Sequence, residues 1–548
     1  MPLQKNQVLT LQVERLSSDG SGVAHSPEGE TVFIPGAAPG DEARVRIVKD
    51  CKRYAFGILD EVLKPSPDRI PVDCAVAGPC GGCSLRHLDY AAELRAKQEN
   101  VADAFARIGG LDVPVLPIVG SPEIDRYRNK VQFPVGTDKA GRPCIGFYAG
   151  RTHRIVPCPD CRLQPGVLNE IGNTLCAFFA EKGIHPYNEE TGKGLVRHIF
   201  LRRGAHSGQI MVCLVSTRAK IPSADELCTR LKEAFPDIVT ILLNVNAKNT
   251  NVILGSETHT LYGQGYIEDT LCGVPVQLGP LSFYQVNTLA AEQLYGIAAE
   301  YAQLTPDDLL LDLYCGMGTI GLSMADHCRE LVGVEIVPEA IESAKANAAR
   351  MGAAVSAKSR FFCADAGQAA AQLAAEGLHP DVVMLDPPRK GCDEATLSAV
   401  VRMAPRRVIY VSCNPATAAR DAAWLEQNGY HAEKVQPVDL FPRTKHCEAV
   451  LLLTKLNVER HIEVDVSMDE LDVTVAESKA TYNEIRDYVL EHHQLKVSNL
   501  YIAQVKQKYG IIERENYHKA KNENAKQPQC PKEKEDAIVE ALKHFQMI

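Results

Sequence analysis

The fold of this chain is decided by the stretch Leu309-Leu310-Leu311-Asp312-Leu313-Tyr314-Cys315-Gly316-Met317-Gly318-Thr319-Ile320-Gly321. An apolar run typical of a buried strand leads directly into a glycine-rich turn and then into a helix. Its glycines have the spacing G-x-G-x-x-G, which also occurs in dinucleotide-binding turns and is weak on its own. From about residue 280 to residue 455, predicted strands alternate with predicted helices. We therefore expect an α/β fold with a Rossmann-like, doubly wound parallel sheet.

Acidic residues at the ends of successive predicted strands distinguish between two cofactors. Asp312 precedes the glycines, where it can bind the ammonium group of a methionine moiety but would repel a pyrophosphate. Glu335 ends the next strand and can hold both ribose hydroxyls, while Asp365 ends the third and can accept from an adenine amino group. Asp386 ends the fourth. An ordinary α/β turn with polar strand ends accounts less well for this series, which favours S-adenosylmethionine.

A candidate nucleophile follows a further predicted strand, in Val411-Ser412-Cys413-Asn414-Pro415. The segment Asp386-Pro387-Pro388-Arg389-Lys390-Gly391 supplies an acid and a guanidinium beside it. Beside a methyl donor, such a cysteine suits the C5 carbon of a pyrimidine, which becomes nucleophilic only after a thiolate adds to C6. A base must then remove the C5 proton so that the cysteine can leave. Glu448 is the candidate base, and His446 is the alternative because histidine is suited to this role.

The cysteine usage indicates reduced thiols. The chain has 548 residues and 18 cysteines, with no signal-peptide core at its start and no apolar run long enough to span a membrane. We therefore expect a cytoplasmic protein that uses cysteines for metal binding and catalysis. Cys74, Cys80 and Cys83 are closely spaced and need a distant fourth ligand, either Cys158 or Cys161. Spacing alone allows a structural zinc or an iron–sulfur cluster.

The chain divides into four predicted regions. Residues 1–63 have alternating strands and glycine-bearing turns, which predict a small OB-like β-barrel of the kind that binds oligonucleotides. Residues 64–280 predict a mixed α+β middle domain, and residues 281–456 contain the catalytic sheet. Residues 457–548 predict a helical appendix. The net charge of −10 gives no general basic surface, so that RNA would be bound by local patches. The basic, aromatic stretch 49–54 is either such a patch or a solvated loop.

The appendix is predicted to contain three helices. Thr481-Tyr482-Asn483-Glu484 has the pattern of a capping box at the start of the first helix. Ser498 can cap the second, and residues 531–545 form an amphipathic third helix. A helix-turn-helix is one interpretation, but the pattern assigns no function.

Five motifs in combination closely resemble those of the RNA uracil-5 methyltransferase family. They are Ser282-Phe283-Tyr284-Gln285-Val286-Asn287, Asp312-Leu313-Tyr314-Cys315-Gly316, Asp386-Pro387-Pro388-Arg389-Lys390-Gly391, Ser412-Cys413-Asn414-Pro415 and His446-Cys447-Glu448. The resemblance covers roughly residues 5 to 455 and implies a class I methyltransferase sheet behind an RNA-binding TRAM barrel. It also implies that Cys413 is the nucleophile and Glu448 the base. The appendix lies outside the family pattern.

The resemblance further implies which residues contact S-adenosylmethionine. These residues are Gln285, Tyr314, Thr319, Glu335, Asp365 and Asp386. Relatives often carry asparagine at the position of Thr319, so this sequence departs from the pattern there.

The resemblance also resolves the cysteine cluster. Ribosomal-RNA members of the family carry a [4Fe-4S] cluster on this cysteine spacing plus one distant cysteine, which aligns with Cys161. The implied ligands are Cys74, Cys80, Cys83 and Cys161, with Cys158 as a neighbour able to substitute. Transfer-RNA members typically lack the cluster.

The expected function is therefore C5-methylation of a uridine in 23S ribosomal RNA by a monomer. The uridine would be flipped into a cleft, where four arginines are candidate phosphate contacts: Arg128, Arg197, Arg202 and Arg203. Two alternatives are a transfer-RNA uridine-54 methyltransferase and a non-catalytic iron–sulfur protein that binds RNA. The intact pair Cys413 and Glu448 argues against the second.

Overall fold

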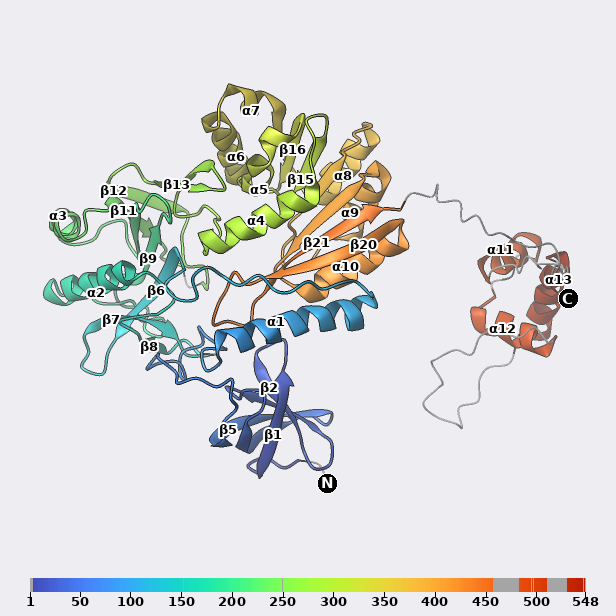
Figure 1. Ribbon diagram of the computed structural model, residues 1–548, viewed down its shortest axis with the longest axis horizontal. Helices are drawn as coiled ribbons and strands as arrows, with labels where there is room; N and C mark the ends of the chain where they lie inside the picture. Colours follow the sequence, from blue (N-terminus) through green and yellow to red (C-terminus); the bar gives the residue numbers. More distant parts are fainter. Residues whose placement is uncertain are drawn as a thin grey trace. The chain divides into compact units, whose positions relative to one another are not determined.

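The computed structural model describes residues 3–150, 152–248, 250–456, 482–493, 495, 497–509, 530–545 and 547. The chain forms two compact units, residues 1–457 and residues 458–548. Figure 1 shows that the first unit contains a small barrel, a middle sheet and a sheet flanked by helices on both faces. Among the described residues, no helix is both long and apolar enough to cross a membrane.

The N-terminal barrel is closed, which confirms the expectation from the sequence. Its strands pair in the order β1-β2-β3-β5-β4. They are β1 (Val8–Leu16), β2 (Ser21–His25), β3 (Thr31–Pro35), β4 (Glu42–Asp50) and β5 (Tyr54–Lys64). Alternation in β4 buries Ala43, Val45 and Ile47 in the barrel while Arg44 and Arg46 face solvent. These two basic side chains lie on the outer face, where Arg44 pairs with Glu61 and Arg46 with Asp60.

The middle sheet has seven strands in the order β12-β11-β10-β9-β6-β7-β8. They are β6 (Lys130–Thr137), β7 (Pro143–Tyr148), β8 (Ile155–Pro157), β9 (Val196–Arg203), β10 (Ile210–Ser216), β11 (Ile238–Val245) and β12 (Glu257–Tyr262), accompanied by α2 (Gly166–Glu181) and α3 (Ala224–Ala234). Every residue of the inner strand β10 is buried. The barrel is joined to this sheet through α1 (Tyr90–Ala104), which continues as a π-helical turn, Phe105–Gly109.

The third sheet confirms the Rossmann-like prediction. Its strand order is β17-β16-β15-β18-β19-β21-β20, and all neighbours are parallel except β21, which runs antiparallel to β19 and β20. The strands are β15 (Leu309–Leu313), β16 (Glu330–Glu335), β17 (Ser359–Cys363), β18 (Val382–Leu385), β19 (Arg407–Ser412), β20 (Tyr430–Val438) and β21 (Glu448–Lys455). The chain order reverses between β15 and β18, and ligands of such sheets bind at this switch point.

Helices cover both faces of this sheet, and the strands divide their side chains between two cores. The helices are α4 (Thr288–Ala302), α5 (Thr319–Ser323), a 3₁₀ turn (Ala325–His327), α6 (Pro338–Arg350), α7 (Ala353–Lys358), α8 (Ala366–Ala375), α9 (Glu394–Met403) and α10 (Pro415–Gln427). In β19, Ile409 and Val411 pack with α4, whereas Val408 and Tyr410 pack with α1 and α10. A strand buried on both sides reads as the continuous apolar run seen in the sequence.

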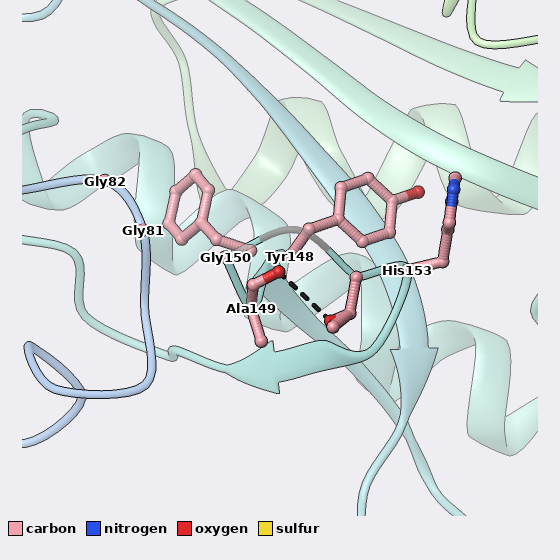
Figure 2. A pocket seen from close by; sticks show the side chains of 8 residues that line it. Gly81, Gly82, Tyr148, Ala149, Gly150 and His153 are labelled. Atoms are coloured by element: carbon pink, nitrogen blue, oxygen red, sulfur yellow. Dashed lines mark hydrogen bonds between the residues drawn. The ribbon is translucent and has the colours of Figure 1, made fainter. Parts of the chain in front are cut away.

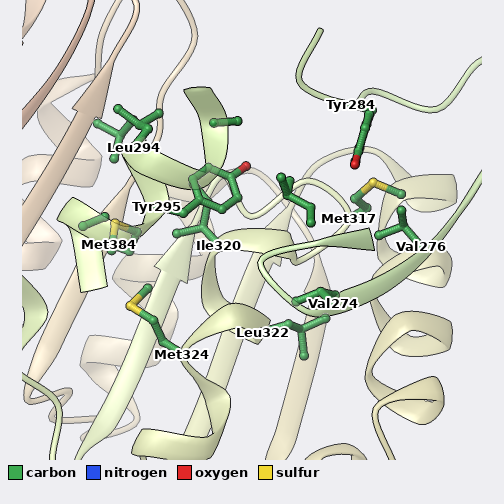
Figure 3. Close-up of a cluster of buried hydrophobic side chains, with 14 of the residues drawn as sticks. Val274, Val276, Tyr284, Leu294, Tyr295, Met317, Ile320, Leu322, Met324 and Met384 are labelled. Carbon is green, nitrogen blue, oxygen red and sulfur yellow. The ribbon is translucent and has the colours of Figure 1, made fainter. Parts of the chain in front are cut away.

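A β-hairpin, β13 (Ile267–Leu271) and β14 (Val274–Leu278), packs on the glycine-rich turn. Figure 3 shows its Val274 and Val276 beside Met317 and Leu322, with Tyr295 of α4 next to Ile320. The turn is therefore fixed from outside the sheet as well as from within it.

The C-terminal unit has its own apolar core and contains α11 (Tyr482–His493), α12 (Asn499–Lys508) and α13 (Lys532–His544). Ser498 caps α12 as expected, because its side chain accepts a hydrogen bond from the Tyr501 amide. Thr481 of the expected capping box lies outside the described residues.

Candidate active site

Five side chains of the catalytic sheet are brought together at one edge by its topology. Parallel strands end at the same edge, so Tyr314 after β15, Glu335 on β16 and Asp386 after β18 lie along it with Cys413 after β19. Strand β21 runs the other way and begins at this edge with Glu448. Residues that are up to 134 positions apart in the sequence (314 to 448) therefore share one site.

Cys413 lies next to Glu448 because of the register between β19 and β21. Ser412 pairs with Ala449, so the residues that follow and precede this pair are Cys413 and Glu448. The cysteine is held in a rigid turn: the Asn414 side chain caps α10 by accepting from an amide (3.2 Å) and donates to the Arg389 carbonyl (2.9 Å). The thiol thus has a fixed position beside a carboxylate.

Most of the groups around Cys413 disfavour its thiolate form, and one group, Arg389, favours it. Burial raises the pKa of Cys413, and the carboxyl groups of Glu448 and Asp386 raise it further. The Arg389 guanidinium lowers this pKa by charge and by a hydrogen bond to the thiol. Burial also raises the pKa of Glu448 to about 8 and that of Asp386 to about 7. Arg389 is therefore the group that can stabilise a thiolate here, and Glu448 has the high proton affinity of a strong base.

His446 is a weaker base than Glu448 in this environment. Burial and the nearby cations Arg389 and Lys445 lower its pKa to about 4, so that it is neutral near pH 7 and holds a proton poorly. Its ring packs edge-on against Phe441, with the two centroids 6.1 Å apart. At neutral pH the higher pKa of Glu448 gives it the greater proton affinity of the two, and its role as base stays a prediction.

At the cofactor end of the site, a fixed carboxylate lies beside exposed apolar side chains. The Glu335 carboxylate accepts from the Gly316 amide (3.2 Å) and from the Val337 amide (2.9 Å), which fixes it at the strand end. Ile336 and Val337, just beyond it, are 63% and 45% exposed. A fixed carboxylate beside an uncovered apolar surface fits a ribose and an adenine ring. Tyr314 stands next to the turn in the left-handed conformation, with φ of 65°.

The comparisons with known proteins agree with this geometry. A family model described as tRNA (Uracil-5-)-methyltransferase matches residues 276–456, and a TRAM domain model matches residues 2–59. An uncharacterized RNA methyltransferase of Halalkalibacterium halodurans is 43% identical over 457 residues, which are 83% of this chain and 99% of that relative. The chain belongs to the RNA uracil-5 methyltransferase family. It is accordingly an enzyme that uses S-adenosylmethionine and acts on RNA.

Two further relatives extend this result to the whole first unit. An uncharacterized RNA methyltransferase of Oceanobacillus iheyensis is 42% identical and covers 83% of this methyltransferase and 98% of its own length. The solved structure of a Pyrococcus abyssi tRNA (uracil-54, C5)-methyltransferase with S-adenosyl-L-homocysteine is 26% identical with a TM-score of 0.65. It covers 82% of this chain and 100% of its own.

Three polar side chains expected at the cofactor form hydrogen bonds within this methyltransferase. Asp312 is buried inside β15, where burial raises its pKa to about 8 and its Oδ2 accepts from the Gly321 amide at 3.0 Å. The Thr319 hydroxyl lies 3.2 Å from the Tyr295 hydroxyl. Asp365 caps α8 by accepting from two amides at 3.1 and 3.2 Å. Asp312 thus fixes the glycine turn with one oxygen, and the cofactor contacts of Asp312, Thr319 and Asp365 stay predictions.

The loop that carries Gln285 is held by the middle domain. Asn129 donates to the Gln285 carbonyl (2.7 Å) and to the Thr288 hydroxyl (2.9 Å). Arg202, only 1% exposed, donates to the carbonyls of Gly279 (3.0 Å) and Ser282 (2.7 Å). The expectation that Arg202 contacts RNA phosphates is wrong, because both ends of its guanidinium are used inside the protein.

Arg197 also departs from the expectation of a phosphate contact. It is 5% exposed and donates to the carbonyls of Asn246 (3.1 Å) and Lys248 (2.7 Å). Arg128 and Arg203 are half-buried, and their role at RNA stays a prediction. The basic strand was misread because a sequence does not show which arginines turn inward to bind backbone carbonyls.

Two segments that carry cysteines of the predicted cluster lie side by side. Cys80 forms a β-bridge with Ala149 in the turn after β7, and a β-carbon on Gly81 would be in ordinary van der Waals contact with the Gly150 Cα, at 3.6 Å. Figure 2 shows Gly81 and Gly82 beside this turn, where they line a pocket of about 510 Å³. The same hairpin leads through β8 to Cys158 and Cys161.

The thiols influence one another without forming a complete ligand set. Burial raises the pKa of Cys80, and the neighbouring thiols of Cys161 and Cys74 raise it further. The Cys158 thiol donates to Cys161 and lowers its pKa to about 7. Among the described residues, no three cysteine, histidine, aspartate or glutamate side chains are arranged as a metal site. The ligand set Cys74, Cys80, Cys83 and Cys161 therefore stays a prediction.

Proposed function

We propose that this methyltransferase modifies C5 of a uridine through a covalent bond between the Cys413 sulfur and C6 of the base. The observation that carries the proposal is the placement of Cys413, Arg389 and Glu448 at the carboxyl edge of the sheet, beside the cofactor end of the site. A thiol, a cation that stabilises its anion and a base of raised pKa are the groups that this chemistry requires.

The proposed steps balance in bonds and protons. The Cys413 thiol gives up its proton to solvent, with Arg389 stabilising the thiolate, and the sulfur adds to C6 so that the ring becomes an enolate. S-adenosylmethionine supplies an electrophilic methyl group: C5 of the enolate forms the new carbon–carbon bond while the bond between the methyl group and the sulfonium sulfur breaks, and S-adenosyl-L-homocysteine is the leaving group. Glu448 takes the proton from C5. The electrons of the C5–H bond restore the C5–C6 double bond, and the C6–S bond breaks to release Cys413 as thiolate.

We assign the other predicted residues to binding and orienting the cofactor and the RNA. Glu335 is placed to accept from the ribose hydroxyls, and Gln285, Tyr314, Thr319, Asp365 and Asp386 are the further candidates for cofactor contacts. The target uridine has to leave its stack to reach Cys413, which is half-buried. On the barrel, the 41% exposed Tyr54 packs edge-on against Phe33 and Phe56. This aromatic cluster can stack on an unpaired base of the bound RNA.

For the target we propose 23S ribosomal RNA, acted on by a cytoplasmic monomer. The support is the cysteine pattern of residues 74–83 with Cys161, which resembles that of ribosomal-RNA members of the family. A transfer-RNA target is the second candidate. It is favoured by the likeness to the Pyrococcus abyssi tRNA (uracil-54, C5)-methyltransferase over 82% of this chain.

Mapping 5-methyluridine in a deletion strain distinguishes these targets. We expect one or more uridines of 23S ribosomal RNA to lose the modification and to regain it when the wild-type gene, but not Cys413→Ala, is returned. Transfer RNA should be unchanged. Loss confined to a transfer-RNA position would replace the proposed target by the second candidate, and no loss in either RNA would contradict both.

We further propose a [4Fe-4S] cluster on Cys74, Cys80, Cys83 and Cys161. Two observations fit a thiolate-bound group: the cysteines of both segments lie within electrostatic range, and the buried guanidinium of Arg86 lies against Cys83. Arg86 is itself held by Asp73 (2.8 Å) and Asp125 (2.6 Å). Methyl transfer needs no electron, so the cluster would brace the loop against the β7–β8 hairpin.

Anaerobic purification tests the cluster. We expect a brown protein with broad visible absorbance and about four iron atoms per chain. Cys80→Ser should lower the iron content and the absorbance, whereas Cys328→Ser, a buried cysteine at the opposite edge of the catalytic sheet, should leave both unchanged. A colourless protein that contains zinc would contradict the cluster and remove the main support for ribosomal RNA.

A further inference from the structure

Four charged side chains are buried together between α1 and the loop 439–447, which joins β20 to β21. Lys97 donates from its Nζ to Glu93 Oε1 (2.7 Å) and to Asp439 Oδ1 (2.8 Å). The side chains of Glu93 and Asp439 are 0% exposed and that of Lys97 is 1% exposed. Arg443 completes the group, with its Nη1 3.7 Å from Glu93 Oε2. The two residues of α1 and the two residues of the loop are adjacent in the fold, although Lys97 and Asp439 are 342 positions apart in the chain.

Stability alone does not account for this group. Removing charges from water is costly, and replacing a buried ion pair by apolar side chains is often neutral or stabilising. The charged groups bind backbone atoms of the loop. Glu93 Oε1 accepts from the Arg443 amide (2.7 Å), and Asp439 Oδ1 accepts from the Phe441 amide (3.1 Å). Lys97 also donates to the Phe441 carbonyl (3.2 Å). The group therefore determines the path of the loop.

The loop needs this support because its path is strained. Arg443 has φ of 68°, a left-handed conformation that is uncommon for a residue with a side chain. Such a residue keeps this conformation when its surroundings fix it. Further contacts act in the same sense: Tyr127 donates to the Pro442 carbonyl (3.0 Å), and Asn287 to that of Leu440 (3.0 Å).

The loop ends at the proposed base. His446 and Cys447 lead directly to Glu448, the first residue of β21, which pairs with Val438, the last residue of β20. The loop thus leaves and re-enters the sheet at the point where the Glu448 carboxylate faces Cys413. A shift of the loop would move this carboxylate, and small misplacements of a reacting group are expensive in rate.

The same loop is bound to the cysteine-rich segment. The amides of Ser84 and Leu85, which follow Cys83 directly, both donate to the Arg443 carbonyl, at 3.0 and 3.1 Å. On its other side, the Arg443 guanidinium donates to the Leu88 carbonyl (3.0 Å). Arg443 therefore joins the segment proposed to bind the cluster to the loop that carries the base.

We propose that Lys97, Glu93 and Asp439 are positioning residues that hold the loop 439–447, and with it Glu448, in place for removal of the C5 proton. Because Arg443 is also hydrogen-bonded to Ser84 and Leu85, the position of Glu448 should depend on whether the segment after Cys83 keeps its conformation. The inference rests on the proposed function, because it concerns the step assigned to Glu448. The chemistry itself is unchanged: Glu448 takes the C5 proton and the C6–S bond breaks.

Asp439→Asn tests the proposal, because asparagine keeps the size and an acceptor oxygen but lacks the charge that holds Lys97. We expect methyl transfer to persist and release of Cys413 to slow by about 10- to 100-fold. The methylated RNA–protein adduct should then accumulate, measured on denaturing gels with a radiolabelled methyl donor. Native-state hydrogen exchange should show faster exchange of the amides of Ser84, Leu85 and Arg443. Glu93→Gln, which keeps an oxygen facing the Arg443 amide, provides a second variant with the same expectation.

Asp308→Asn is the matched control. Asp308 is buried at the opposite edge of the catalytic sheet and accepts from Arg406 at 2.7 Å. We expect this variant to lose stability and to release RNA at the wild-type rate. The positioning role would be overturned if the Asp439 variant accumulated no more methylated RNA–protein adduct than the Asp308 variant. If Glu448→Gln itself forms no adduct, the proposed function fails instead, so the two failures are distinguishable.

Discussion

Cys413→Ala should abolish methylation of RNA, lowering the single-turnover rate by several orders of magnitude. The physical reason is that alanine offers no atom that can bond to C6, so C5 of the uracil stays too weak a nucleophile to take the methyl group. The assay is transfer of a radiolabelled methyl group to unmodified RNA, together with a search for protein–RNA adducts on denaturing gels. Both signals should disappear in the same variant.

Two controls separate loss of the nucleophile from loss of the fold. S-adenosyl-L-homocysteine should raise the melting temperature of Cys413→Ala as much as that of the wild type, because the cofactor residues are unchanged. Cys328→Ala removes a buried thiol at the far edge of the sheet, where β16 begins, and should retain activity. Turnover that survives in Cys413→Ala would refute the covalent mechanism.

The catalytic sheet could be predicted from the sequence because its strands are local signals. Val408 to Val411 is buried on both faces and was therefore visible as a continuous apolar run. Asp312 and Asp386 were visible for the same reason, since each lies in or directly after such a run. Placement at one edge then followed from the parallel topology.

The roles of individual polar groups were less predictable, because they depend on neighbours distant in sequence. Asp312, expected at the cofactor, is buried beneath the turn and accepts from the Gly321 amide through one oxygen, so that a cofactor contact of its other oxygen stays a prediction. Arg202 was expected at phosphate, but two backbone carbonyls around residue 280 take up its donors. In both cases the competing partner is a backbone group, which a sequence does not reveal.

For Arg389, the sequence indicated the location of the residue but not its role. Its presence beside the nucleophile was visible in the segment 386–391, but its role was not, because Cys413 and Glu448 come from two other strands. The structure shows that its charge lowers the pKa of the Cys413 thiol against the effect of burial and two carboxyl groups. The group Glu93, Lys97 and Asp439 was missed entirely. Its only sequence signal is a Glu–Lys pair at i and i+4 on α1, which is ordinary on helix surfaces.

Glu448→Gln should trap the methylated RNA on the enzyme. Glutamine matches the carboxylate in size but does not accept the C5 proton as a base, so addition and methyl transfer should proceed while release of Cys413 stops. We expect a stable protein–RNA adduct that carries the labelled methyl group, in place of free product. Glu330→Gln, a surface acid at the opposite edge of the sheet paired with Arg360, should release product normally.

The pH dependence of the two proteins provides the decisive measurement. Burial raises the pKa of Glu448 to about 8 from its ordinary 4.5, so the carboxylate that acts as base forms as pH rises. Product release in the wild type should therefore accelerate through about pH 8, and the variant should lose this dependence. The same shift makes the charged form unfavourable in the folded protein, so the wild type loses stability between pH 4.5 and about 8. Glu448→Gln, which carries no charge, should then melt at a higher temperature than the wild type above pH 8 and at a similar one near pH 4. Rapid release from the variant would return the role of base to His446, whereas trapping together with the alkaline gain in stability would assign it to the buried carboxylate of Glu448.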